Sequence, residues 1–288
     1  MPDPAVSVVI ATRNRASLLA GALASLRAQA GIPSCELVVV DNGSTDTTAA
    51  VAREQGAICV SVPEPNRGLA RNAGVAAASG AIVLFVDDDV IVPPFFVAAH
   101  LRAHAAEPAP HVVSGPILNV PSPDDRPVPT WLNASNAYFC TCNASLPKAS
   151  FDAVGGFDAA FDQYGWEDTE LGVRLRAAGL KRRFAWDAYL WHIKPPATET
   201  LDAALVKTIE KARMAAKFVR KAPSSRARLA TGAYAFNRWR ARVLLPVRAQ
   251  PLLAGLATSS RVPPPLARLA RELVLDSVYV AELDRALG

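Results

Sequence analysis

The sequence predicts an α/β protein in which an open, wound, mostly parallel sheet has flanking helices and is followed by a basic helical C-terminal extension. Three observations support this prediction. Apolar runs alternate with helical patterns in the first half, polar side chains collect where the runs end, and basic side chains collect after residue 200. Near-continuous apolar runs are typical of strands buried on both faces of a parallel sheet, and their alternation with helices is typical of wound sheets.

Four apolar runs are the expected strands of this sheet. They are VSVVIA (6–11), ELVVV (36–40), AICVSV (57–62) and AIVLFV (81–86). Three helices are expected between them. The first has Leu18 to Leu26 at helical spacing, the second (44–56) begins with capping residues and ends at Gly56, and the third spans 68–80.

The second half of the chain is less regular. We expect a strand at 137–146, a helix from about 168 to 178, and short strands within KRRFAW and AYLWHIK. The pattern then predicts a basic amphipathic helix at 200–221 and a last helix near 265–286. We place a domain boundary between residues 197 and 198, so that 1–197 form the α/β domain and 198–288 the basic helical region.

Composition restricts location and partners. Residues 1–200 carry 15 basic and 20 acidic side chains, whereas residues 201–288 carry 16 basic and 6 acidic ones. The start of the chain does not resemble a signal peptide, and no apolar run approaches the ~18 residues of a membrane span. We therefore expect a cytoplasmic protein. The basic helix either contacts the anionic inner face of a membrane or packs its apolar side on the α/β domain, and the last helix offers a surface for a homodimer.

Three adjacent carboxylates, Asp87, Asp88 and Asp89, follow the fourth apolar run. Buried charges are costly unless they are paired or bind a metal. On an extended chain Asp87 and Asp89 point the same way, and their oxygens suit Mg²⁺ or Mn²⁺. Thr12 and Asp41 directly follow the first two runs, and ligands of wound sheets bind beyond such strand ends. The pattern predicts a metal and phosphate site, with a solvated acidic turn as the alternative.

Other patterns exclude some functions. The chain has neither the phosphate-binding loop of P-loop NTPases nor a GxGxxG after the first strand, which disfavours NTPases and dinucleotide oxidoreductases. The aromatic and basic interleaving of RNA-binding proteins is missing, so we expect no nucleic acid partner. The four cysteines are expected to be reduced core thiols, with Cys140 and Cys142 on one face of a strand; a metal or redox role is the alternative.

Six stretches in order resemble family 2 glycosyltransferases of the GT-A fold: VSVVIATRNR, ELVVVDNGSTDTT, NRGLARNAG, LFVDDDV, GGFDAAF and WEDTELGVRLRAAG. The resemblance covers about residues 5–195. It implies an inverting transfer from a nucleotide-diphosphate sugar, with a UDP-sugar favoured, to the hydroxyl of a sugar, lipid-linked or small-molecule acceptor. It also implies Mn²⁺ or Mg²⁺ at the Asp-x-Asp (DXD) motif.

The resemblance assigns roles to individual residues. Asp168 is implied to be the catalytic base, with Glu167 positioning the acceptor or tuning Asp168; from the residues alone, both could simply begin a helix. Asp89 is the implied metal ligand, together with Asp87 and His192. The implied donor-binding residues are Thr12, Arg13, Asp41, Arg71, Asn72, Asp87 and Asp88.

Two alternatives to a glycosyltransferase stay open. A sugar-nucleotide nucleotidyltransferase would have a glycine-rich basic loop after the first strand, but ATRNRASLL stands there, and Asn14 and Arg15 are expected to start the next helix. A non-catalytic nucleotide-sugar-binding scaffold could have lost Asp89 or Asp168, and both are present.

Overall fold

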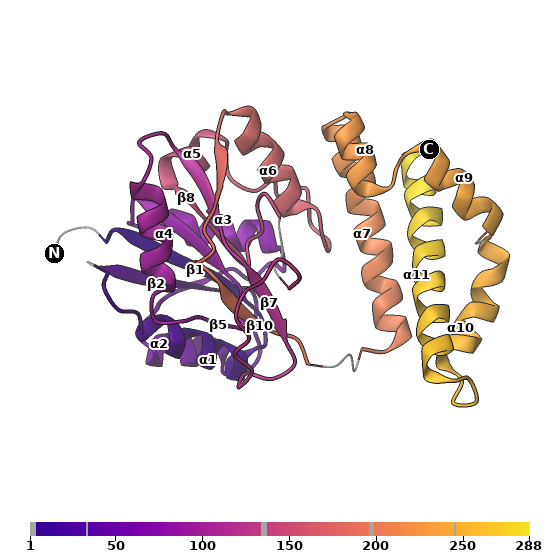
Figure 1. Cartoon of the computed structure of the whole chain (residues 1–288), viewed down its shortest axis with the longest axis horizontal. Helices are drawn as coiled ribbons and strands as arrows, with labels where there is room; N and C mark the ends of the chain where they lie inside the picture. Colours follow the sequence, from indigo (N-terminus) through magenta and orange to yellow (C-terminus); the bar gives the residue numbers. More distant parts are fainter. Residues whose placement is uncertain (1–3, 33, 134–136, 196–198, 245) are drawn as a thin grey trace. The chain divides into compact units, whose positions relative to one another are not determined.

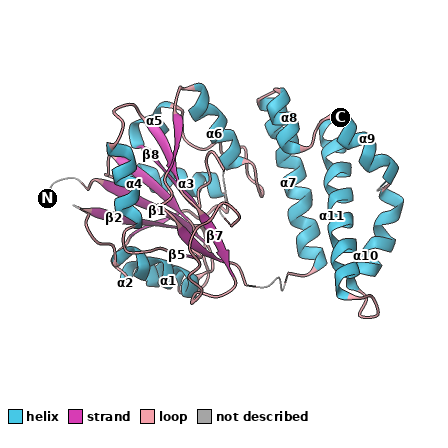
Figure 2. Cartoon of the chain, viewed as in Figure 1, coloured by secondary structure: helices cyan, strands magenta, loops and turns pink. Residues whose placement is uncertain are grey.

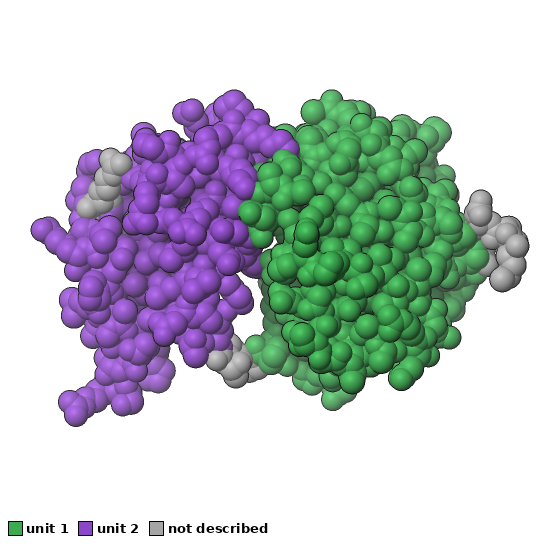
Figure 3. Space-filling model, turned by 180° about the vertical axis from the view of Figure 1, so that it is seen from behind, with its two compact units in different colours: residues 1–162, 167–197 green, residues 163–166, 198–288 purple. Residues whose placement is uncertain are grey.

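The computed structural model describes residues 4–32, 34–133, 137–195, 199–244 and 246–288. The chain forms two compact units, residues 1–162 with 167–197 and residues 163–166 with 198–288, which Figure 3 shows in different colours. The predicted boundary between residues 197 and 198 lies outside the described residues.

The first unit is built on a seven-stranded sheet with the order β3-β2-β1-β4-β8-β6-β9. Within it, β8 runs antiparallel to β4 and β6, and the other neighbours are parallel. A smaller sheet has the order β5-β10-β7, and Figure 2 shows the strands in magenta. The bounds are β1 (Val6–Thr12), β2 (Cys35–Asp41), β3 (Ile58–Ser61), β4 (Ile82–Val86), β5 (Val90–Ile91), β6 (His111–Ser114), β7 (Ile117–Val120), β8 (Asn143–Pro147), β9 (Lys181–Phe184) and β10 (Leu190–Ile193). The predicted α/β class and mostly parallel sheet are confirmed.

Helices pack on both faces of the large sheet because side chains alternate along its strands. Val8 of β1 belongs to an apolar cluster with α1, α2 and α4, whereas its neighbour Val9 belongs to one with α3, α5 and α6 (Figure 1). Gly74 lets α3 approach the sheet closely, since a Cβ there would lie 2.5 Å from Val9 Cγ1. The helices are α1 (Ala16–Arg27), α2 (Thr48–Glu54), α3 (Arg67–Ala77), α4 (Phe96–Ala105), α5 (Lys148–Ala153) and α6 (Glu167–Ala177).

Two predicted elements are shorter than expected. The helix expected at 44–56 begins only at Thr48, because the Asp46 carboxylate accepts hydrogen bonds from the Thr48 backbone and hydroxyl and forms a turn. The strand expected at 137–146 begins only at Asn143. The Asn143 N–H donates to the Cys140 carbonyl at 3.0 Å, an ordinary hydrogen-bond distance, and this bond closes a turn. The prediction that Cys140 and Cys142 share one face of a strand was therefore wrong.

A buried histidine joins α4 to β8. The two ring nitrogens of His100 lie 2.8 Å from Ser145 Oγ and 2.9 Å from Asn143 Oδ1. Burial lowers the pKa of His100 to about 4, and burial likewise lowers the pKa of His104, which also contacts Ser145, to about 3. The folded protein therefore favours the neutral form of both rings.

We expect acid to destabilise this unit through His100. In the unfolded chain the ring takes up a proton as the pH falls through about 6.5, whereas the folded protein resists protonation until about pH 4. This stabilisation is complete above the unfolded pKa and is lost as the pH falls. It should amount to about 2–3 kcal/mol between pH 7.5 and 4.5. Urea unfolding across this range should show the free energy of unfolding falling more steeply with decreasing pH for wild type than for His100→Gln. Parallel plots of this free energy against pH would contradict the prediction.

The second unit is helical. Its elements are α7 (Leu201–Lys221), α8 (Ser225–Thr231), α9 (Ala235–Leu244), the 3-10 helix η1 (Val247–Ala249), α10 (Gln250–Thr258) and α11 (Pro264–Leu287). Residues 163–166 belong to it because the Trp166 indole donates to the Lys211 carbonyl at 3.0 Å and stacks on Phe218. The predicted helical extension is present. No helix of the described residues is both long enough and apolar enough to cross a membrane.

The apolar face of α7 packs within this unit. Ala212, Ala216 and Val219 form a core with Leu283 of α11, and the two helices lie side by side (Figure 1). On its polar side, Arg213 pairs with Glu282 at 2.7 Å. We expected this face either to contact a membrane or to pack on the α/β domain. It packs on α11 instead. The face that a membrane-bound α7 would need is buried.

Candidate active site

The polar strand ends meet at one edge of the large sheet, as predicted. Thr12 ends β1 and lies opposite Asp41, which ends β2. The hydroxyl of Thr12 donates to Asp88 Oδ2 at 2.6 Å, just beyond the end of β4. Asp41 accepts the Ser44 N–H at 3.0 Å and so holds the turn after β2. Parallel strands bring these residues together because their carboxyl ends share one edge.

Arg15 joins this edge, which sequence reasoning missed. Its backbone lies at the start of α1, as expected, but its guanidinium returns to the strand ends. Nη1 lies 2.7 Å from Asp89 Oδ2 and 3.2 Å from Asp88 Oδ1. Burial raises the pKa of Asp88 to about 6, although Thr12 and Arg15 act in the opposite direction. A basic residue shortly after a strand end, in a chain with an acidic cluster, was the available signal. Arg13 is exposed.

Arg71 links Asp87 of the Asp triplet to the carboxylates of Glu167 and Asp168. It is buried on α3, and its Nη2 lies 3.5 Å from Asp87 Oδ1. Its Nη1 lies 3.4 Å from Glu167 Oε1 and 3.7 Å from Asp168 Oδ1. Burial raises the pKa of Glu167, and the charge of Asp168 adds to this effect. One cation therefore holds together carboxylates that are 80 positions apart in the chain.

Asn72 has a structural role in this conformation. Its amide nitrogen donates to the Phe157 carbonyl and its Oδ1 accepts the Phe157 N–H, both at 2.8 Å. This pairing ties α3 to the turn formed by Gly155 and Gly156, each with positive φ. Because both polar groups of the amide are used, Asn72 does not join Arg71 at the carboxylates.

Asp168 is held by one oxygen and leaves the other without a hydrogen bond. Oδ2 accepts from the backbone N–H and from the hydroxyl of Thr141, each at 2.9 Å. Oδ1 is buried and has no hydrogen-bond partner among the described residues. Buried carboxylate oxygens are normally hydrogen-bonded, so this one calls for an explanation. A carboxylate oxygen of this kind can accept a proton or a hydrogen bond, and Arg71 Nη1 lies 3.7 Å from it.

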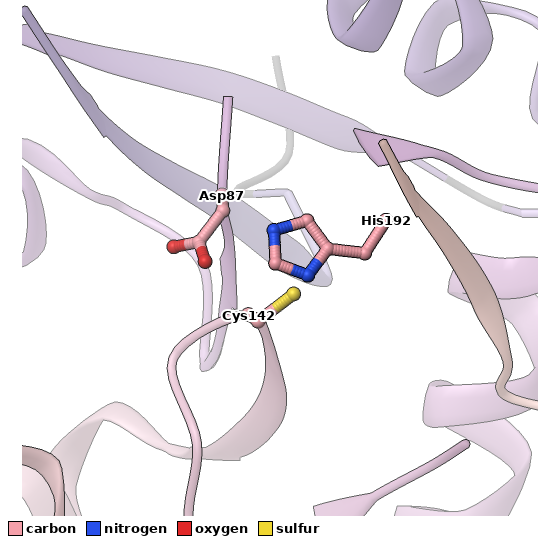
Figure 4. Close-up of side chains that lie close together, drawn as sticks. All are labelled: Asp87, Cys142 and His192. Carbon is pink, nitrogen blue, oxygen red and sulfur yellow. The ribbon is translucent and has the colours of Figure 1, made fainter. Parts of the chain in front are cut away.

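His192 and Cys142 lie close to Asp87 of the Asp triplet, as Figure 4 shows. The potential ligand atoms of the three residues all lie within 4.8 Å of one another. His192 reaches the site because it lies opposite Val90 in the smaller sheet. A carboxylate oxygen and an imidazole nitrogen are suitable ligands for Mn²⁺. The residues therefore fit a divalent cation.

Asp89 does not join this group of three. Residues 88 and 89 form a turn between β4 and β5, so Asp87 and Asp89 do not alternate as they would on an extended chain. The stretch is therefore not extended as expected, although both carboxylates lie near His192. Asp89 instead pairs with Arg15, and its Oδ1 lies 3.0 Å from His192 Nε2. It therefore borders the potential metal site through the histidine.

Cys142 was expected to be a reduced core thiol, with a metal or redox role as the alternative. It is buried and reduced, as predicted, but it also lies against the Asp87 carboxylate. Burial raises the pKa of its thiol well above the ordinary value, and the negative charge of Asp87 adds to this. Its closeness to Asp87 follows from the register in which β8 pairs with β4. The sequence alone does not give this register.

The comparisons with known proteins agree with this architecture. The family model described as "Glycosyl transferase family 2" matches residues 7–163. Validoxylamine A glucosyltransferase of Streptomyces hygroscopicus subsp. jinggangensis (strain 5008) is 32% identical over 265 residues, covering 77% of this chain. The matched region spans 62% of that relative's length.

Two solved structures share the fold. The first is the mannosyltransferase PcManGT from Pyrobaculum calidifontis in complex with GDP-Man and Mn²⁺, with 21% identity and a TM-score of 0.64 over 99% of this chain and 87% of that one. The second is S. aureus TarS 1–349 in complex with UDP-GlcNAc, with 18% identity and a TM-score of 0.57 over 97% of this chain and 90% of that one. The predicted GT-A fold is confirmed, and since the family model covers more than half of the chain, this protein belongs to glycosyl transferase family 2.

Proposed function

We propose that this protein is an inverting, metal-dependent glycosyltransferase that moves a sugar from a nucleotide-diphosphate donor to an acceptor hydroxyl. The observation that carries the proposal is the set of three ion pairs of Arg71, which joins Asp87 to Glu167 and Asp168. It brings donor-side and acceptor-side carboxylates into one site. The sugar nucleotides bound in the two structures of similar fold support the same reading.

The donor would lie along the edge formed by Thr12, Asp41 and Asp88. We keep Arg13, Arg71 and Asp87 as donor contacts and add Arg15, whose guanidinium already binds two carboxylates there. We leave out Asn72, because its amide is bonded to Phe157. A UDP-sugar remains our first choice of donor, and a GDP-sugar is the next, since one of the structures of similar fold holds GDP-Man.

The metal would be held by Asp87 and His192, with Asp89 beside them. When bound, Mn²⁺ or Mg²⁺ supplies positive charge that stabilises the departing diphosphate. Five carboxylates (Asp87, Asp88, Asp89, Glu167 and Asp168) share ion pairs with the guanidinium groups of Arg15 and Arg71, and the charge of Arg67 also acts on Glu167. This excess of negative charge favours the binding of a cation, and the cation would also offset the charge of a diphosphate bound beside the carboxylates.

Asp168 would act as the base. Its Oδ1 takes the proton of the acceptor hydroxyl while the hydroxyl oxygen forms a bond to the anomeric carbon. At the same time the bond from that carbon to the diphosphate oxygen breaks, and the nucleoside diphosphate leaves. Attack on the face opposite the leaving group inverts the anomeric configuration. Thr141 keeps the carboxylate in place through Oδ2.

Ligand-induced stabilisation tests this proposal. Thermal unfolding of wild type and Asp87→Asn would be measured with UDP, GDP, TDP and CDP sugars, each with and without Mn²⁺. We expect one nucleotide family to raise the Tm of wild type in a metal-dependent way, because a ligand at 100 times its Kd stabilises the folded state by about 2.7 kcal/mol. Asp87→Asn should lose the effect.

The same preparations separate the alternatives. Release of nucleoside diphosphate in the presence of an acceptor supports transfer, whereas release of pyrophosphate from a nucleoside triphosphate and a sugar phosphate would indicate a nucleotidyltransferase. Stabilisation by a sugar nucleotide without any turnover would indicate a binding scaffold. A folded protein that no sugar nucleotide stabilises would contradict the proposed donor site.

The helical unit has a candidate membrane contact, which we move from α7 to α9. Phe236, Trp239 and Val243 are all more than half exposed and, at spacings of three and four residues, share one helical face. The Phe236 and Trp239 rings lie 5.8 Å apart. Exposed aromatic side chains in a strongly basic region are typical of helices that lie on anionic membranes. This surface would suit a lipid-linked acceptor.

Vesicle flotation tests the α9 contact. We expect wild type to bind phosphatidylserine-containing vesicles more than pure phosphatidylcholine, and Phe236→Ser with Trp239→Ser to lower binding at least about tenfold, because two large apolar side chains lose their burial. Val206→Ser, which changes an exposed apolar residue of α7, is the control. If the double variant leaves vesicle binding unchanged but abolishes a dimer in sedimentation, the face pairs subunits instead.

A further inference from the structure

Three donor atoms of different chemistry meet at the end of β4, and strand pairing places them there. Val86 of β4 lies opposite Asn143 of β8 in an antiparallel pair, so the next residues outward, Asp87 and Cys142, are neighbours. His192 is placed by the pairing of β10 with β5. All three side chains converge, with their ligand atoms within 4.8 Å of one another (Figure 4).

The sulfur of Cys142 lies in a different environment from an ordinary core thiol. Its side chain is 4% exposed and contacts the apolar cluster on one side, but on the other side it meets a carboxylate and an imidazole. Asp87 remains partly exposed, with 31% of its side chain accessible, so an ion can reach the group. Cys140, two positions away and half-buried, is not part of the group and serves as an internal comparison.

We propose that Cys142 is a metal ligand, and that its thiolate, together with Asp87 and His192, gives this site a preference for thiophilic divalent cations such as Zn²⁺, Co²⁺ and Cd²⁺ over Mg²⁺. The inference rests on the proposed function, because it concerns the cation of the same site. Thiolate ligands select softer metals, whereas Mg²⁺ is bound by oxygen.

The geometry and proton balance of such a site are ordinary. Zinc binds sulfur at about 2.3 Å and imidazole nitrogen at about 2.0–2.1 Å, which brings ligand atoms closer together than the 4.8 Å limit within which the three lie here. The thiol loses its proton to solvent as the metal–sulfur bond forms, and no oxidant or reductant is needed. The imidazole binds in its neutral form, and the Asp87 carboxylate offsets one charge of the ion.

Cobalt titration of the full chain tests the inference without measuring activity. A cysteine thiolate bound to Co²⁺ produces a charge-transfer absorption in the near ultraviolet. We expect this band in wild type and in the triple variant Cys35→Ser/Cys59→Ser/Cys140→Ser, in which Cys142 is the remaining thiol. In Cys142→Ser the band should be absent, and Co²⁺ affinity measured by calorimetry should fall at least about tenfold, the loss that even outer-shell changes cause.

Each other outcome overturns the inference in a distinguishable way. Stoichiometric Co²⁺ binding by wild type without the band would exclude thiolate ligation, yet it would leave the metal-dependent transferase intact. A band that persists in Cys142→Ser, or that disappears in the triple variant, would assign the sulfur to another cysteine. If Cys142→Ser does not fold, the triple variant decides, because Cys142 is unchanged in it. Absence of Co²⁺ binding would overturn the inference, and transfer measured with and without EDTA would then test the proposed function independently.

Discussion

Asp168→Asn is expected to lower kcat by about 10²–10⁴-fold while leaving donor affinity unchanged. General base catalysis contributes this much to rate, and an amide cannot take the proton of the acceptor hydroxyl. The side chain should keep its place, because an Asn oxygen can still accept both hydrogen bonds from Thr141. Initial rates of nucleoside diphosphate release, with the donor and metal identified by the thermal unfolding screen, would measure the effect.

Two matched variants separate catalysis from structure. Glu167→Gln changes the neighbouring carboxylate and should reduce kcat less than Asp168→Asn does. Thr141→Val removes one of the two hydrogen bonds to Oδ2 and should give an intermediate loss, since the backbone N–H still holds Asp168. The base assignment would be wrong if Asp168→Asn retained more than a tenth of the wild-type kcat, or if Glu167→Gln had the larger effect.

Arg71→Met is expected to lower the free energy of unfolding by about 3–5 kcal/mol at pH 7.5. Removing one partner of a buried ion pair leaves uncompensated charge, which is the costly case. Here Asp87, Glu167 and Asp168 would all lose the same cation. Met keeps most of the length of the side chain, so the charge and not the volume is changed. Urea unfolding followed by circular dichroism would measure the difference.

Two further variants check the cause of this loss. Arg53→Met, which removes an exposed arginine on α2, should change stability by no more than about 0.5 kcal/mol. The double variant Arg71→Met/Glu167→Gln should be more stable than Arg71→Met alone. In the double variant, the Glu167 charge that Arg71→Met leaves unpaired is also removed. Equal stability losses for Arg53→Met and Arg71→Met would mean that Arg71 does not hold the acidic site together.

The sequence by itself determined the first four strands, the three helices between them and the edge at which the site lies. The four apolar runs became β1 to β4, and the helical patterns between them became α1 to α3 with ends shifted by a few residues. This was possible because a strand buried on both faces shows in any window of its own residues. Thr12, Asp41 and Asp88 could be placed together for a similar reason, since parallel strands end on one side of their sheet.

Only the tertiary structure decided which side chains of that edge meet. Arg15 reaches Asp88 and Asp89 across the sheet, and Cys142 lies beside Asp87 through the antiparallel register of β8. Asp89 turns toward Arg15 because the chain bends after β4. These contacts join segments that are far apart in the chain, and they depend on strand register and on a turn, neither of which leaves a periodic signal. The apolar face of α7 is a similar case: its helical pattern predicted a buried face, but only the fold shows that α11 covers it.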